Sequence, residues 1–244
     1  MRVTKSRPWT LAGKAARLVT RRPAPTIPKL IGDLAPGKSF ADLGGMFLID
    51  GEHTFLAADA GATSAICVDM REISEKFERE ASKRSGVEYL QGDFSSPHVA
   101  EKLGVVDVVW CWGVLYHHPS PYQLLRSLYR ICGERLVIET LVIPEVHGLP
   151  NAAVYFPYQE QGDRVLWDVP YGRRTKMRTE RYAISTAYRP DLGYTNNFWG
   201  MSPSCVSAVM RTAGFRVERV LPSPNGVFRK VFVARVIPNV DDME

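Results

Sequence analysis

Several features that would place this chain in a specialised class are missing from its 244 residues. No apolar run approaches the roughly 18–20 residues that span a bilayer, so stable membrane insertion is not expected. The N-terminus has no apolar core of the kind found in secretory signals. None of the four cysteines forms a CxxC pair, which argues against a structural zinc site and for reduced, buried thiols. These absences predict an ordinary globular protein of the cytoplasm.

Acidic residues are missing from the first 30 positions, which hold eight Lys and Arg residues of a chain with net charge +5. Such an arm suits nucleic acid, anionic lipid or a phosphorylated substrate, or it packs as a solvated leader on the domain or on a partner subunit. Trp9–Val19 fits a short basic helix, and the proline-rich run 23–28 is expected to end it and act as a stiff connector. We therefore predict a basic N-terminal accessory segment over residues 1–36.

From residue 37 to residue 236, strand and helix patterns alternate. Apolar runs predict strands at 39–43, 65–69, 87–90, 105–110, 135–140, 215–220 and 227–236. Amphipathic or capped segments predict helices at 52–60, 74–85, 97–103, 121–131 and 203–213. This alternation predicts an α/β fold with a doubly wound, Rossmann-like sheet, mostly parallel with an antiparallel edge strand. An aromatic and basic insertion occupies 141–201 as a lid or substrate segment, and 237–244 is expected to be a disordered tail.

Acidic residues stand where the first three strands end, and parallel sheets bind ligands at that edge. Asp42 precedes a pair of glycines; it would repel a pyrophosphate but suits a cationic amino group. Asp69 ends the second strand and can accept hydrogen bonds from both hydroxyls of a ribose. Asp93-Phe94 follows the third strand and offers a carboxylate and an aromatic ring to an adenine. An amino group, a ribose and an adenine without phosphate together describe S-adenosylmethionine.

A single aspartate at a strand end is often only a cap or a turn residue, but several such positions in this order favour the cofactor. The glycine turn continues through the apolar residues 46–49, so it is longer and more apolar than a dinucleotide-binding loop. The residues predicted to bind the cofactor are Asp42, Gly44, Gly45, Gly51, Asp69, Met70, Asp93, Phe94, Trp112 and Gly113.

The order of these motifs resembles class I S-adenosylmethionine-dependent methyltransferases over residues 38–140. Within that superfamily, Trp112-Gly-Val-Leu-Tyr-His-His-Pro-Ser-Pro121 and Ile138-Glu-Thr-Leu-Val-Ile143 resemble the enzymes that modify the wobble uridine of tRNA with a carboxymethyl group. Asn196-Asn-Phe-Trp-Gly-Met-Ser-Pro203 resembles the same group. The resemblance implies the methyltransferase version of the sheet and S-adenosyl-L-methionine as cofactor.

Tyr116, His117 and His118 follow the fourth strand, where the methyl group of such a cofactor is expected to point. His117 is the predicted general base, because an imidazole titrates in the useful range. Tyr116 is predicted to orient the donor or the acceptor, and Glu139 to support His117 or contact substrate. The alternatives are structural: either histidine could be a plain hydrogen bonder, His118 could cap the next helix, and Glu139 could be a buried, hydrogen-bonded carboxylate.

The insertion combines aromatic and basic residues, an arrangement that holds sugars, flat rings or bases. Substrate contacts are predicted for His118, Tyr155, Asn197 and Trp199. The spacings H-x-x-x-H and D-x-D are missing, so no metal site is predicted, although individual carboxylates leave Mg²⁺ open.

The favoured function is O-methylation of a hydroxyl on a small molecule, sugar or glycan, by in-line displacement with His117 as base. One alternative is a tRNA-modifying methyl- or carboxymethyltransferase, which the basic arm and the motif resemblance favour. A second is a non-catalytic binding module that has kept the fold. The expected partner is therefore a small-molecule or saccharide acceptor, with tRNA as the alternative, and a homo-oligomer is left open.

Overall fold

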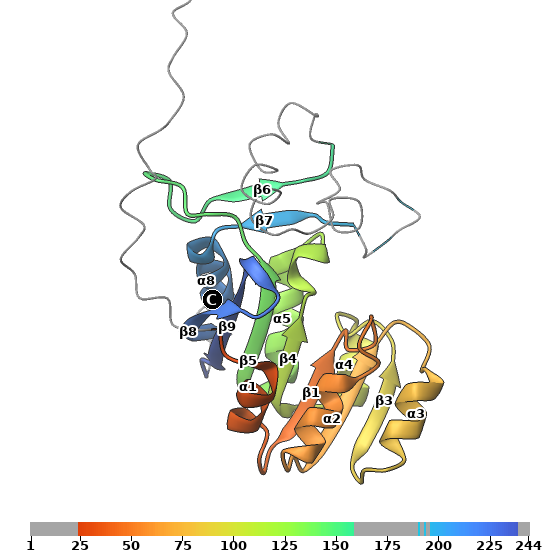
Figure 1. Cartoon of the computed structure of the whole chain (residues 1–244). Coiled ribbons are helices and arrows are strands. Elements are labelled where there is room, and N and C mark those ends of the chain that lie inside the picture. The colour runs from red at the N-terminus through yellow and green to blue at the C-terminus, as the bar shows by residue number, and fades with distance from the viewer. Residues whose placement is uncertain (1–23, 159–189, 191–192, 194–195, 239–244) are drawn as a thin grey trace, which may run out of the picture.

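Figure 1 shows the computed structural model of the chain, which describes residues 24–158, 190, 193 and 196–238. Seven strands form one sheet in the order β3-β2-β1-β4-β5-β9-β8, with helices on both faces. The strands are β1 (Ser39–Leu43), β2 (Ser64–Asp69), β3 (Val87–Gln91), β4 (Val106–Trp112), β5 (Cys132–Leu141), β8 (Phe215–Ser223) and β9 (Gly226–Val236). The helices are α1 (Ile27–Leu34), α2 (Glu52–Asp59), α3 (Glu75–Ala81), α4 (Pro97–Leu103), α5 (Pro121–Ile131) and α8 (Pro203–Thr212). The predicted doubly wound α/β sheet is confirmed.

The first five strands run parallel, and the closing hairpin contributes β8 and β9. β9 pairs antiparallel with β5 on one side and with β8 on the other. The predicted antiparallel strand is therefore β9, one place in from the edge, while β8 at the edge runs in the direction of β5. This reversal brings the start of β9 beside the end of β5, where Arg229 stands opposite Leu141.

Side-chain caps and prolines begin the helices on one face of the sheet. Ser96 and Ser202 each accept a hydrogen bond from a backbone N–H three residues on, and a proline follows each of them in the first turn. Of the two serines that precede α4, Ser96 is the one that caps the helix. The serine side chain accepts a hydrogen bond from an N–H that the first helical turn leaves unpaired, and proline has no such N–H to satisfy. Both residues therefore favour the start of a helix at these positions.

Two apolar cores enclose the sheet. One lies beneath α4, α5 and α8 and includes Leu124, Leu125 and Leu128 of α5, all completely buried. The other lies beneath α1 and α2, around Phe40 and Trp110. Because strand side chains alternate between faces, Asp42 projects from the same face as Phe40, and Trp112 from the same face as Trp110. The polar strand ends therefore lie above the second core.

The N-terminal boundary differs from the accessory segment expected over residues 1–36. Thr26 caps α1, and Pro28 lies in its first turn. Leu30 and Ile31 are buried in the core beneath α1 and α2. Pro28 thus begins a helix of the domain instead of serving as a connector, because a proline is well tolerated in a first helical turn. The helix predicted at Trp9–Val19 lies outside the described residues.

The insertion returns to the sheet through a two-stranded ribbon of β6 (Ala153–Tyr155) and β7 (Trp199–Met201). Figure 1 shows this ribbon lying across the top of β4 and β5, and the backbone N–H of Ile143 donates to Met201 at 3.1 Å. All four cysteines are buried and free, as predicted. No helix in the described part of the chain is long and apolar enough to cross a bilayer.

Candidate cofactor and transfer site

β1 ends in a glycine turn that packs against the carboxylate of Asp42. Asp42 is completely buried, and its Oδ2 accepts a hydrogen bond from Thr54 Oγ1 at 3.0 Å. A Cβ on Gly45 would lie 2.3 Å from that same Oδ2, so the turn needs glycine here. Oδ1 is also buried and has no hydrogen-bond partner among the described residues. An orphaned acceptor of this kind fits a ligand that carries a donor, such as an amino group.

Burial, opposed by hydrogen bonds from Thr54 and assisted by the charge of Asp69, raises the pKa of Asp42 to about 7. A cation beside Asp42 would favour the ionised form and lower this pKa. Burial also raises the pKa of the neighbouring Cys67 thiol, which therefore stays neutral. The carboxylate of Asp42 is thus the group whose charge state a ligand at this position would change.

Asp69, at the end of β2, fastens the glycine turn to the sheet. Its Oδ2 accepts a hydrogen bond from the Met46 N–H at 2.9 Å, and its Oδ1 accepts one from the Arg71 N–H at 3.0 Å. A carboxylate oxygen can accept more than one hydrogen bond, so these contacts leave capacity for hydroxyl groups. The residue predicted to bind a ribose therefore also fixes the turn that lies beside it.

The rim of this turn is apolar and exposed. Phe47 and Leu48 are 54% and 71% exposed, and Met70, after β2, is 50% exposed. The Arg71 guanidinium lies 4.6 Å from the centroid of the Phe47 ring. Exposed apolar side chains next to a buried carboxylate are typical of the wall of a ligand site.

Unusual backbone conformations mark the passage from the turn into α2. Leu48 and Asp50 have φ angles of 65° and 47°, in the left-handed region that costs a non-glycine residue about 1–3 kcal/mol. Gly51 has a φ of 78°, and a Cβ on it would lie 2.4 Å from the Phe77 ring. The predicted cofactor residue Gly51 is therefore needed for helix packing, and the strain at its neighbours is concentrated beside the site.

The two residues predicted to contact an adenine after β3 both make structural contacts. Asp93 Oδ1 accepts hydrogen bonds from the N–H and the Oγ of Ser95, at 2.8 and 2.6 Å, which makes a turn into α4. Phe94 is only 9% exposed and belongs to the core that contains Val99 and Leu103. The Phe94 ring was expected to face an adenine, but the structure places it in the core under α4.

Two stacked tryptophans lie below the end of β4. The rings of Trp110 and Trp112 are 4.8 Å apart and within 4° of parallel. His53 of α2 accepts a hydrogen bond from Trp110 Nε1 at its Nδ1, at 3.2 Å, and burial lowers the pKa of His53 to about 4. Trp112 Nε1 is buried without a partner among the described residues. Gly113 follows with a φ of 76°, and its missing Cβ would lie 3.3 Å from an Arg229 nitrogen.

A backbone carbonyl fixes the ring of His117. His117 Nδ1 lies 2.8 Å from the oxygen of Asn196. A carbonyl oxygen only accepts, so Nδ1 carries the proton and Nε2 carries the lone pair. Burial lowers the pKa of His117 to about 4 despite this hydrogen bond, and the charge of Arg229 acts in the same direction. The imidazole is therefore neutral near pH 7, with a defined tautomer.

His118 serves the turn before α5. The N–H of Ser120, the residue before that helix, donates to His118 Nδ1 at 3.0 Å, and burial lowers the pKa of His118. This contact is structural, but it fixes the turn before α5 and does not cap the helix itself, which has no side-chain cap.

The ribbon of the insertion is hydrogen-bonded to the segment after β4. The Phe198 N–H donates to the Tyr116 oxygen, and Trp199 Nε1 donates to the Pro119 oxygen, both at 2.9 Å. Trp199 was predicted to contact substrate, but its indole N–H is used within the protein.

Two other residues predicted to contact substrate lie on or beside the same ribbon. Asn197, two residues before Trp199 in the sequence, is half-buried. Tyr155 is 46% exposed, and its ring meets the Trp199 ring edge-on with centroids 5.0 Å apart. Tyr155 and Trp199 therefore place two aromatic rings together at this edge of the sheet, whereas most other aromatic residues of the insertion lie outside the described residues.

Glu139 is a buried partner of an arginine, not of His117. Its carboxylate accepts hydrogen bonds from Arg229 Nε at 2.5 Å and Nη2 at 2.6 Å, and from Ser223 Oγ at 2.7 Å. Burial alone would lower the pKa of Arg229, but the bonds to Glu139 raise it overall. Arg229 Nη1 also donates to the Tyr116 hydroxyl at 3.2 Å. The structural alternative for Glu139 is thus the one observed, and Tyr116 is held beside a cation.

Sequence reasoning missed Arg229, Ser223, Thr54 and His53. Arg229 lies in the largely apolar strand Val227–Val236, which also carries Lys230 and Arg235. It was a usable signal, because an ionic group among apolar residues needs a partner. The partner, Glu139, is 90 residues away, and only the antiparallel pairing of β5 with β9 brings the two together.

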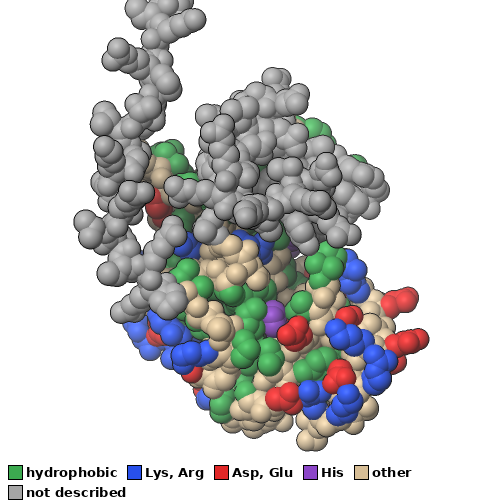
Figure 2. Space-filling view, in the orientation of Figure 1, with side chains coloured by type: hydrophobic (Ala, Val, Ile, Leu, Met, Phe, Trp, Pro, Cys, Tyr) green, Lys and Arg blue, Asp and Glu red, His purple; other side chains and the backbone are tan. Residues whose placement is uncertain are grey.

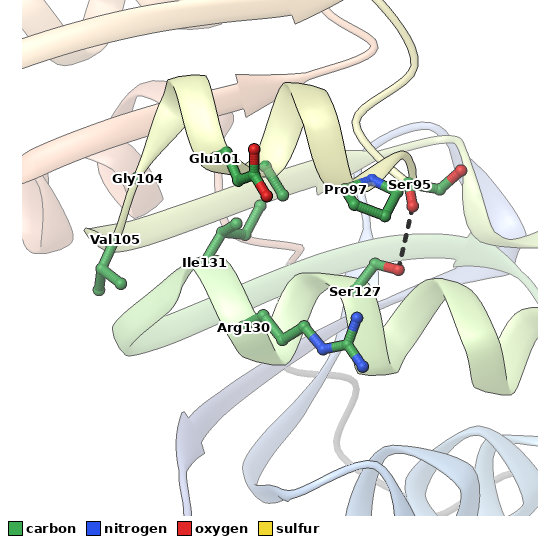
Figure 3. A pocket seen from close by; sticks show the side chains of 9 residues that line it. Ser95, Pro97, Glu101, Gly104, Val105, Ser127, Arg130 and Ile131 are labelled. Carbon is green, nitrogen blue, oxygen red and sulfur yellow. Dashed lines mark hydrogen bonds between the residues drawn. The ribbon is translucent and has the colours of Figure 1, made fainter.

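A separate groove of about 320 Å³ lies between α4 and α5 (Figure 3). Ser127 Oγ donates to the Ser95 backbone oxygen at 3.3 Å at one end of it. The groove contains none of the predicted site residues, and its charged lining residues are Glu101 and Arg130. The chemistry described above therefore lies elsewhere, at the carboxyl edge of the sheet. Among the described residues, no group of three or more His, Cys, Asp or Glu could hold a metal ion.

Comparison with known proteins agrees with the fold. Residues 49–135 match the family model described as a methyltransferase domain. The match, the strand order and the carboxylates at the ends of β1 and β2 are consistent with the S-adenosylmethionine-dependent methyltransferase that the sequence predicts.

The tRNA U34 carboxymethyltransferase of Psychrobacter sp. (strain PRwf-1) is 30% identical over 62% of this chain and 43% of its own length. The protein of the same description from Methylococcus capsulatus is 28% identical over 79% and 50%. The chain thus spans about half the length of the curated relatives it matches. Magnesium protoporphyrin IX methyltransferase from Synechocystis PCC 6803 shares the fold, with a TM-score of 0.55 and 17% identity over 86% of this chain and 80% of that one.

Proposed function

We propose that this protein transfers a one-carbon group from S-adenosylmethionine to an acidic hydroxyl of its acceptor, with His117 as the general base. The observation that carries the proposal is the fixed tautomer of His117, whose Nδ1 is held by the Asn196 oxygen at 2.8 Å. A base must present a lone pair to the proton that it removes, and this hydrogen bond assigns the lone pair to Nε2.

The residues at the ends of β1 and β2 fit the cofactor. Asp42 Oδ1, buried without a described partner, would accept from the amino group, and Asp69 would accept from the ribose hydroxyls. Gly45 lets the backbone lie against Asp42, where any side chain would collide with the carboxylate. When bound, S-adenosylmethionine supplies an electrophilic carbon on its sulfonium sulfur. The chain's own task is then to align an oxygen nucleophile and to remove its proton.

The low basicity of His117 limits the choice of acceptor. Burial lowers the pKa of His117 to about 4, so the imidazole is always unprotonated near pH 7 but is a weak base. Proton transfer is efficient when the pKa values of donor and base approach each other. A phenol-like or heterocyclic hydroxyl therefore matches this base better than the alcohol of a sugar. The first candidate acceptor is accordingly a small aromatic molecule with an acidic hydroxyl.

A nucleobase of tRNA is the second candidate acceptor. The similarity to tRNA U34 carboxymethyltransferases favours it, as does the cationic Arg229 that donates to the Tyr116 hydroxyl at 3.2 Å. A carboxymethyl group carries a negative charge, which an adjoining guanidinium would stabilise. Transfer of that group would require a related sulfonium donor that carries a carboxymethyl group in place of the methyl group, and His117 would remove the proton of the base hydroxyl in the same way.

The test compares His117→Ala with His98→Ala, a control at an exposed histidine of α4. Radiolabelled S-adenosylmethionine would be supplied with hydroxylated aromatics, methyl glycosides or tRNA that carries a hydroxylated base, in separate assays. We expect His117→Ala to slow transfer by about 10²–10⁴-fold, with cofactor affinity unchanged by calorimetry. The His98→Ala control should behave as the wild type.

Full transfer activity in His117→Ala would exclude the base assignment. Failure of the wild type to bind S-adenosylmethionine would exclude it as the cofactor. Salt separates the acceptors, because RNA binding weakens steeply as counterions are released, whereas a small neutral acceptor shows no such dependence.

A further inference from the structure

A row of arginines crosses three strands of the sheet. In the strand register, Arg135 of β5 stands opposite Arg235 of β9, and Arg235 stands opposite Arg216 of β8. Arg219 of β8 stands opposite Val233 and projects from the same face. We call Arg135, Arg216, Arg219 and Arg235 the arginine row. Figure 2 shows Lys and Arg side chains gathered at the left edge of the molecule, where β8 and β9 lie in Figure 1.

The fold balances only part of this charge. Neighbouring strands are about 4.8 Å apart, and like charges directly opposite each other repel. Glu218, in the bulge of β8, accepts a hydrogen bond from Arg135 and lies 3.5 Å from Arg235 Nε. Neither Arg216 nor Arg219 has a side-chain hydrogen bond or ion pair with any described residue. The arginine row thus presents excess positive charge on a rigid surface.

We propose that the arginine row binds the phosphates of a nucleic acid strand and so docks an RNA acceptor; the inference rests on the second candidate acceptor above. Guanidinium groups bind phosphate oxygens in a two-pronged geometry. Three adjacent strands hold such groups across about 10 Å. A phosphodiester chain supplies repeated anions over that length, whereas a small aromatic acceptor has no charge to fill the row.

The arginine row lies far from the reacting groups. Arg135 precedes Glu139 by four residues on β5, which is about 13 Å along an extended strand. The nearby Lys38 is paired with Glu134 at 2.6 Å and adds no unbalanced charge. The row therefore contributes to RNA affinity and leaves cofactor binding unaffected. A polynucleotide can cover this distance, so one strand can contact the row while a base reaches His117.

The experiment uses the full chain and a fluorescein-labelled, unmodified tRNA anticodon stem-loop, with binding followed by fluorescence anisotropy at several salt concentrations. The row variant is Arg216→Gln with Arg219→Gln, because neither side chain has a described partner whose loss would disturb the fold. The control variant is Arg79→Gln with Lys102→Gln, which removes the same charge from exposed positions of α3 and α4.

We expect the row variant to weaken RNA binding about tenfold at roughly 0.15 M salt and to reduce the slope of log K against log salt by about 1.4. The control should change affinity by no more than about twofold under the same conditions. Arg235→Gln should weaken binding as well, with its thermal unfolding recorded to exclude misfolding. Calorimetry with S-adenosylmethionine should give the same affinity for wild type and row variant.

Three results would overturn the inference: no RNA binding by the wild type at low salt, equal losses in the row and control variants, or no loss in the row variant. Loss of binding to phosphatidylserine vesicles with RNA binding intact would assign the arginine row to a membrane surface instead. If the wild type fails to bind S-adenosylmethionine but the row variant still loses RNA, the transferase proposal fails while the docking surface stands.

Discussion

The site has a cofactor half around Asp42 and Asp69 and a transfer half around Tyr116 and His117. The contacts that build the two halves span very different separations along the sequence. In the cofactor half, Asp42 bonds to Thr54 and Asp69 bonds to Met46, 12 and 23 residues apart. In the transfer half, His117 bonds to Asn196 across 79 residues, and Tyr116 bonds to Arg229 across 113. The cofactor half therefore needs only one βαβ unit. The transfer half forms only after the C-terminal part of the chain has joined the sheet. Changes in the transfer half should therefore affect folding more than changes in the cofactor half.

The largest expected loss of stability comes from breaking the buried ion pair of the transfer half. In Arg229→Met, Glu139 remains completely buried and loses both bonds to the guanidinium. Leaving one buried charge without its partner typically destabilises a protein by about 3–5 kcal/mol. We expect that decrease in the free energy of unfolding, measured by urea denaturation near pH 7.

Two controls give this result its meaning. The double variant Arg229→Met with Glu139→Leu removes both charges and should recover most of the lost stability. Arg84→Met breaks a surface pair with Asp59, whose carboxylate is 54% exposed, and should lower stability by no more than about 1 kcal/mol. If Arg229→Met is no more harmful than Arg84→Met, the transfer half does not depend on this long-range pair.

The same contrast explains which features of the fold and the site could be predicted from the sequence. The strand and helix order, and the position of Asp42 and Asp69 at adjacent strand ends, follow from apolar runs and nearby turn residues. These are local patterns, and the structure confirms the sheet that they predict. Phe94 shows the limit of such patterns, because its place after β3 was identified but its packing into the core was not.

Features that depend on distant pairing could not be predicted. Whether Glu139 supports His117 or binds an arginine depends on which strand lies beside β5, and that strand begins some 85 residues later with Gly226. The role of Trp199 likewise depends on the path by which the insertion returns to Pro119. Pro28 was misassigned because a proline-rich run is compatible with both a connector and a helix start.

An intermediate effect is expected in the cofactor half, where Asp42→Asn should weaken S-adenosylmethionine binding by about 10–100-fold, the value of a charge-assisted hydrogen bond. Because burial raises the pKa of Asp42 to about 7, the wild-type carboxyl is protonated below that pH and cannot pair with an ammonium. Affinity should then rise with pH up to about 7 and fall above about 8, where α-amino groups lose their proton. Calorimetry from pH 5 to 9 would measure this profile.

The free energy of unfolding should change with pH in the opposite direction to the cofactor affinity. Asp42 has a raised pKa, so the folded state disfavours its ionised form; the resulting stability is complete below the ordinary value of 3.8 and is lost as pH rises through about 7. Asp42→Asn should remove both pH dependences, whereas Asp33→Asn, at an exposed site on α1, should leave them unchanged. An Asp42→Asn protein that keeps the wild-type binding profile would show that another group holds the amino end.

The smallest expected effect tests whether the two halves are separate. Trp199→Phe keeps an aromatic ring but removes the 2.9 Å hydrogen bond to the Pro119 oxygen, worth about 1 kcal/mol. That bond holds the segment whose Asn196 oxygen fixes His117, so we expect a several-fold loss of kcat/KM for the acceptor and an unchanged Kd for S-adenosylmethionine. Tyr122→Phe, at an exposed position of α5, is the matched control and should change neither. If Trp199→Phe weakens cofactor binding as much as transfer, the ribbon supports the whole edge of the sheet, and the division between a local and a long-range half does not hold.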